Sequence, residues 1–91
     1  MKFVTMGMMR SMISPAQCRA ARGLLDWKQS ELAERAGVGI VTVRQFEASS
    51  HDPRRATLEV IRRAFESAGI EFIDENSGGA GVRFRERQKQ K

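Results

Sequence analysis

Four side chains between positions 40 and 45 could form a recognition surface, because they combine hydrogen-bonding and apolar groups at helical spacing. Arg44 supplies a guanidinium and Gln45 an amide, while two aliphatic groups come from Ile40 and Val41. Successive helical residues advance by about 100°, so these four side chains lie on one arc. The opposite arc can be buried and carries Thr42, Val43 and Phe46. An outward face of this composition is unusual for a surface that meets only water.

The stretch from Gln29 to Glu47, QSELAERAGVGIVTVRQFE, would position that face. Its first half has Leu32, Ala33 and Ala36 at helical spacing. Gly37 then stands where a helix that ends in the left-handed conformation favours glycine. A second helix resumes near Ile40, after a turn of about 3–4 residues, which is the pattern of a helix-turn-helix.

Cations flank this stretch on both sides. Gln29 opens a helix, whose unsatisfied N–H groups and positive dipole end favour an anion, and Lys28 lies beside it. Arg54 and Arg55 precede the next predicted helix, where positive charge is disfavoured by about 0.3–1 kcal/mol at an exposed site. A bound anion explains this arginine pair better than a purely structural role.

No residues show the spacing of a catalytic or metal site. Glu47 lacks a second carboxylate at a motif spacing, His51 is the only histidine, and Cys18 is the only cysteine. We therefore expect no enzymatic activity, no metal and no cofactor. Cys18 is interpreted as a small buried thiol.

Length and charge limit the class of protein. The 91 residues predict one small domain that a second subunit could help to stabilise. A net charge of +5 and a pI of about 10.4 favour an anionic partner. No apolar run approaches about 18 residues and the Met-rich start lacks a signal-peptide core, so we expect no membrane association and a cytoplasmic location.

The chain divides into four predicted segments. Residues 1–13 have no clear helical period, and we interpret them either as a flexible arm or as a product of start-site choice. Ser14, Pro15 and Gln17 are typical of a helix start, and residues 14–69 are predicted to be a helical domain. Residues 70–85 follow as a hairpin, and residues 86–91 form a polar, basic tail that is predicted to be disordered.

The hairpin prediction comes from a change of period to two after Gly69. An isolated hairpin is marginal in water, so it must dock on the fourth helix or pair with a second subunit. Its apolar residues are the predicted dimerisation set, namely Ile70, Phe72, Ile73, Val82 and Phe84.

Residues 14–69 resemble the xenobiotic-response-element, or Cro/C1-type, helix-turn-helix family of phage and bacterial regulators. The most specific parts are the runs QSELAERAGV and TVRQFE. The resemblance implies a mainly α fold, a compact four-helix lambda-repressor-like DNA-binding domain, here with a C-terminal strand or hairpin. Two departures stand out: Gly39 replaces the usual Ser or Thr cap, and the hairpin replaces the fifth helix of many members.

The resemblance also implies roles for individual residues. The third helix would enter the major groove with Ile40, Val41, Arg44 and Gln45 at base-reading positions, and Arg22 would pair with Glu47 as a structural clamp. Contacts to DNA phosphates would come from Lys28, Gln29, Thr42, Arg54 and Arg55.

The expected function is therefore that of a transcriptional regulator, a repressor or autorepressor, which binds a palindromic operator in double-stranded DNA as a homodimer. One alternative is an antitoxin that binds a toxin protein as well as its operator. A second alternative is a protein-interaction module that kept the fold and lost DNA binding.

Overall fold

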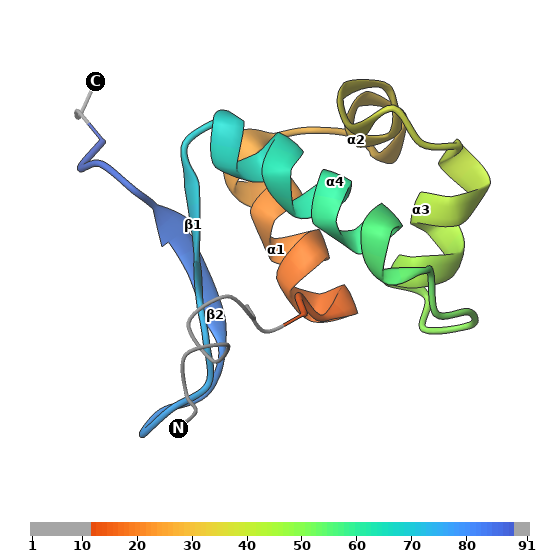
Figure 1. Cartoon of the computed structure of the whole chain (residues 1–91). Helices are drawn as coiled ribbons and strands as arrows, with labels where there is room; N and C mark the ends of the chain where they lie inside the picture. The colour runs from red at the N-terminus through yellow and green to blue at the C-terminus, as the bar shows by residue number, and fades with distance from the viewer. Residues whose placement is uncertain (1–11, 89–91) are drawn as a thin grey trace, which may run out of the picture.

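Four helices followed by a two-stranded hairpin make up the computed structural model, which describes residues 12–88 (Figure 1). The predicted mainly helical fold with a C-terminal hairpin is confirmed. Most of the predicted N-terminal extension and the last three residues of the predicted tail lie outside the described residues. The elements are α1 (Pro15–Leu25), α2 (Gln29–Ala36), α3 (Ile40–Glu47), α4 (Arg55–Ser67), β1 (Ile70–Ile73) and β2 (Gly81–Phe84).

The predicted start of α1 is confirmed by its capping box. The Ser14 hydroxyl accepts from the Gln17 backbone N–H at 3.1 Å, and the Gln17 side chain accepts from the Ser14 N–H at 2.9 Å. Ile13, which the sequence placed in the extension, is buried, so packing begins one residue earlier than predicted. Leu24, in the last turn of α1, is 39% exposed.

The turn between α2 and α3 also follows the prediction. Gly37 ends α2 with φ of 72°, in the left-handed region that glycine adopts without steric cost. Two residues later Gly39 is the N-cap of α3, with no side chain to bond the first N–H groups of that helix. At the start of α4 the boundary differs by one position, since Arg54 is the N-cap and Arg55 is already helical.

The buried residues of the core come from all four helices and β1, with Ile13 before α1. The fully buried large side chains of the core are Leu32 of α2, Val43 of α3, Ile61 and Phe65 of α4, and Ile70 of β1. Trp27, in the connection between α1 and α2, is stacked on Phe65 with 5.6 Å between ring centroids. Trp27 thereby fills the space between α1, α2 and α4 as part of the core.

The hairpin packs against the helices through one face. β1 and β2 are antiparallel, with Ile70 opposite Phe84 and Phe72 opposite Val82. Gln17 of α1 holds the hairpin by donating to the Gly81 carbonyl at 3.0 Å, and the edge of the Phe72 ring meets Phe65 at 5.8 Å. In Figure 1 the hairpin lies on one side of the helices and α3 on the other.

Candidate nucleic-acid interface

The α3 helix has one buried side and one exposed side. Val43, Phe46 and Glu47 are buried, whereas Arg44 and Gln45 are exposed and Val41 is 56% exposed. Three of the four residues predicted to face outward therefore do so. α3 therefore exposes the aliphatic side chain of Val41 beside the guanidinium of Arg44, and a surface of this composition is suited to contact with a partner.

Two residues of α3 lie differently from the expectation. Ile40 was predicted to face outward, but it is partly buried and packs against the core, because it stands at the start of α3 beside the turn. Thr42 was placed on the buried arc and is half exposed. The fully outward set on α3 is thus Val41, Arg44 and Gln45.

A buried carboxylate fixes the end of α3 to the rest of the domain. Glu47 is 4% exposed, and its Oε1 and Oε2 accept from Nη2 and Nε of Arg22, both at 2.7 Å. The predicted Arg22–Glu47 pair is therefore confirmed, and it has the bidentate geometry in which arginine binds carboxylates best. Arg22 also donates from Nη1 to the Trp27 carbonyl at 3.0 Å, which ties α1 to the connection before α2.

Two further donors complete the Glu47 site. The Cys18 thiol of α1 donates to Oε2 at 3.1 Å, and Nε2 of Gln29 at the start of α2 donates to Oε1 at 3.0 Å. The Arg19 guanidinium donates to the backbone carbonyl of Glu47. One residue of α3 thereby holds α1, α2 and α3 together, and the outward face of α3 is attached to a hydrogen-bonded support.

The ionisation of this cluster follows from its contacts. Burial alone would raise the pKa of the Glu47 carboxyl, but hydrogen bonds from Arg22, Cys18 and Gln29 outweigh burial and lower that pKa. The hydrogen bond to Glu47 raises the pKa of Arg22. Burial, followed by the hydrogen bond to Glu47, raises the pKa of Cys18. The cluster therefore contains a carboxylate, a guanidinium and a neutral thiol.

Four of the five residues predicted to hold phosphates lie at the N-termini of α2 and α4, and the fifth, Thr42, lies within α3. Lys28 is exposed at the N-cap of α2, where its own N–H donates to the Glu31 carboxylate at 3.3 Å. Arg54 and Arg55 are exposed at the start of α4, and the first turn of α4 contains no acidic residue and no side-chain cap. The first N–H groups of α4 are therefore available to an external anion.

Gln29 has a second role that its predicted phosphate contact did not include. One of its amide hydrogens is used in the bond to Glu47, and a carboxamide nitrogen carries two. The other hydrogen and the backbone N–H at the first position of α2 remain suited to an anion. The bond to Glu47 fixes the orientation of this side chain before any ligand arrives.

Sequence reasoning missed Cys18 and Arg19 as parts of the framework around Glu47. Cys18 and Arg22 are four residues apart, so they share one face of α1, and that spacing was the available signal. The carboxylate that these two side chains contact depends on the angle at which α1 crosses α3. Local sequence patterns do not specify that angle.

Among residues 12–88, no helix is both long enough and apolar enough to cross a bilayer, and no three His, Cys, Asp or Glu side chains are grouped so that they could hold a metal ion. Residues 19–71, more than half of the chain, match the model of a family described as Helix-turn-helix. No curated protein matches the chain.

Proposed function

Because the chain belongs to the Cro/C1-type helix-turn-helix family, a non-catalytic family whose domain binds DNA sequence-specifically, we propose that it is a transcriptional repressor acting on a palindromic operator. The observation that carries this proposal is the two-sided α3. Its inner side is fixed by Val43, Phe46 and the Glu47 clamp, while Val41, Arg44 and Gln45 project outward. Such a protein acts where the DNA is, in the cytoplasm with the nucleoid.

In the proposed complex α3 lies in the major groove. Arg44 donates to a guanine edge, Gln45 bonds an adenine, and Val41 packs on a thymine methyl group. Each good bidentate base contact contributes about 1–3 kcal/mol of discrimination. Ile40 adds a smaller contact at the start of α3, since only part of its side chain is exposed.

A second set of residues sets the docking register without reading sequence. Lys28 and Gln29 at the start of α2 and Arg54 and Arg55 at the start of α4 contact backbone phosphates, and the half-exposed Thr42 adds a hydroxyl. The two helix N-termini and their cations flank α3. Binding across a promoter at this register would exclude other proteins from the same DNA, which is the simplest route to repression for a chain of this size.

We also propose that the protein acts as a homodimer through its hairpin. Ile70 and Phe72 are buried within the chain itself, so they would support the dimer by holding the hairpin rather than by touching a partner. Val82 and Phe84 share that face and pack against the core, so they also act mainly by holding the hairpin. The partly exposed Ile73, on the opposite face of β1, and the strand edges remain for the contact between subunits.

The division of labour between base and phosphate contacts is tested by two arginine substitutions. Electrophoretic titrations on the protein's own upstream region, and on a panel of altered sites, are made at two salt concentrations. Arg44→Ala is expected to change which base is preferred. Arg54→Ala is expected to weaken all sites alike and to reduce the slope of log K against log salt by about 1.

Arg87→Ala serves as the matched control, because Arg87 is an exposed arginine outside the proposed interface. The affinity of the Arg87→Ala variant for DNA, and the salt dependence of that affinity, should equal those of the unaltered chain. If Arg44→Ala and Arg54→Ala give the same uniform loss across the panel, the assigned roles are wrong. DNA binding without any salt dependence would contradict the proposed phosphate contacts.

A further inference from the structure

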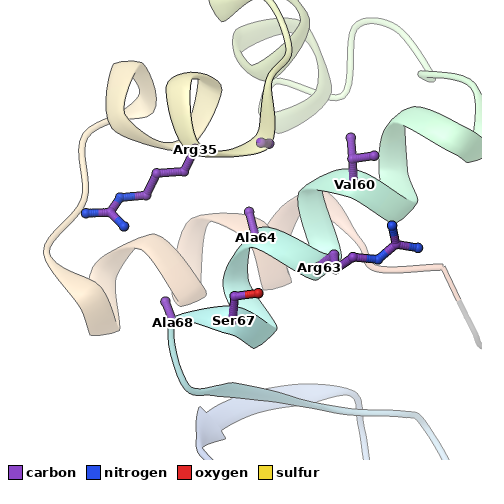
Figure 2. A pocket seen from close by; sticks show the side chains of 7 residues that line it. Arg35, Val60, Arg63, Ala64, Ser67 and Ala68 are labelled. Carbon is purple, nitrogen blue, oxygen red and sulfur yellow. The ribbon is translucent and has the colours of Figure 1, made fainter.

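A groove runs between the second half of α2 and α4 (Figure 2). Its volume is about 420 Å³. The floor is made of small apolar side chains, and these are Ala36, Val60, Ala64 and Ala68. The polar lining residues are Arg35, Arg63 and Ser67, and Figure 2 shows the two arginines extending toward opposite ends of the groove.

The two arginines are available for an external anion. Arg35 and Arg63 are both exposed, and within residues 12–88 neither of them forms an ion pair. The guanidinium of Arg35 lies 4.6 Å from the centroid of the Trp27 ring, and Trp27 is itself stacked on Phe65. This cation–π contact orients Arg35 in advance, which lowers the entropy lost when a ligand binds.

The groove lies away from the proposed DNA contacts. Phosphates are assigned to the N-terminal ends of α2 and α4, whereas the groove is lined by the last two residues of α2 and by residues of α4 from Val60 to the C-cap Ala68. Arg63 is eight residues beyond Arg55, which corresponds to about 12 Å along the helix axis. A partner in the groove could therefore bind while α3 is on DNA.

We propose that this groove binds an acidic segment of a partner protein, with an apolar side chain on the alanine floor and carboxylates at both ends. Charge complementarity with Arg35 and Arg63 selects acidic groups, and the floor needs an apolar group that a nucleic acid backbone does not have. The chain's own first eleven residues carry Lys2 and Arg10 and no acidic residue, so they do not fit. A basic toxin does not fit either.

The test uses short random peptides displayed on phage and selected against the immobilised full-length chain. Selected peptides are then titrated against the unaltered chain and against the double variant Arg35→Gln/Arg63→Gln. We expect sequences in which Asp or Glu flank a Leu, Ile, Val or Phe, and about tenfold weaker binding to the double variant. Ser67→Phe, at an exposed position, should block binding by filling the groove.

Arg87→Gln is the control for loss of charge outside the groove, and it should bind the peptides normally. Circular dichroism and operator binding of each variant establish that the fold and the DNA interface are intact, and the peptide result does not depend on whether operator binding is found. A selection that yields no peptide overturns the proposal. So do peptides without acidic enrichment, or peptides that bind the double variant equally well.

Discussion

Glu47 shows how one buried charge can be retained in a small domain. Removing a carboxylate from water is costly unless charged and hydrogen-bonded partners replace the lost hydration. Here Arg22, Cys18 and Gln29 provide four hydrogen bonds between them, two from Arg22 and one from each of the others. Glu47, the last residue of α3, is consequently the residue that joins α1, α2 and α3.

Acid titration should reveal this dependence. The folded state lowers the pKa of Glu47, so its stabilisation is complete above the unfolded value of about 4.5 and is lost as pH falls through the folded pKa. Arg22 stays charged throughout. We expect Glu47→Gln to lower the free energy of unfolding by about 1–3 kcal/mol at neutral pH, and to lose less stability than the unaltered chain on acidification. Urea unfolding at a series of pH values measures both effects.

Glu86→Gln is the matched control, because Glu86 is an exposed carboxylate outside the cluster. Its stability should follow that of the unaltered chain at every pH. If Glu47→Gln and the unaltered chain lose stability in parallel below pH 4.5, the cluster does not carry the acid dependence.

At the scale of single residues, prediction from sequence succeeded where a short pattern sufficed. The pairing of Arg22 with Glu47 came from the family resemblance, and the outward positions of Val41, Arg44 and Gln45 came from helical periodicity. The contacts of Cys18 and Gln29 with Glu47 were not predicted, because they bring together residues from different helices. Periodicity also misplaced Ile40, since the neighbouring turn shields the first residue of a helix.

Among the elements, α3 begins with an unusual cap. Gly39 has φ of −72° and ψ of 148°, which any residue can adopt, and a Cβ placed there would meet only the Thr42 hydroxyl at 3.9 Å. Neither the backbone conformation nor the surrounding space therefore requires glycine at position 39. It leaves the first N–H groups of the recognition helix without a side-chain acceptor.

Gly39→Ser should stabilise the domain, because the hydroxyl can cap α3 and the unfolded chain loses conformational freedom. The expected gain is about 0.5–1 kcal/mol, which corresponds to a rise in Tm of roughly 2–8 °C. Gly37→Ser is the contrasting variant, since φ of 72° is strained for serine and should cost about 1–2 kcal/mol. Thermal unfolding followed by circular dichroism compares the two, and equal shifts would refute this account of the turn.

The start of α1 and the end of α2 were predictable from local signals, namely the Ser14 capping box and the Gly37 stop. The hairpin was predicted as an element, but its packing was left open between docking on the fourth helix and pairing with a second subunit. The structure shows docking, with Ile70 and Phe72 buried in the chain. The reason lies in tertiary contacts, such as the Gln17 bonds to both strands, which local sequence does not specify.

At the scale of the whole molecule, the proposed dimer can be tested through Ile73. This residue is on the opposite side of β1 from the buried Ile70 and Phe72, and it is partly exposed. Light scattering at micromolar concentration should give twice the chain mass of 10.2 kDa for the unaltered protein. Ile73→Lys should shift this toward the monomer, since it places like charges across the interface, with little loss of Tm.

Gln88→Lys introduces the same charge at an exposed position outside the hairpin and should leave the mass unchanged. A dimer should also require two half-sites about 34–36 Å apart, or a multiple of that spacing. A protein that is monomeric at micromolar concentration and binds single half-sites as well as paired ones would contradict the dimer.

The two-sided construction of α3 has a consequence for how such a protein can evolve. Val43, Phe46 and Glu47 hold the helix in place from within, so substitutions at the outward Val41, Arg44 and Gln45 remove few interactions that the fold needs. In the proposed complex, new binding specificities would therefore arise by mutation at three positions without a matching loss of foldability. A gene duplicate of this chain would then acquire a different DNA site while its scaffold remained unaltered.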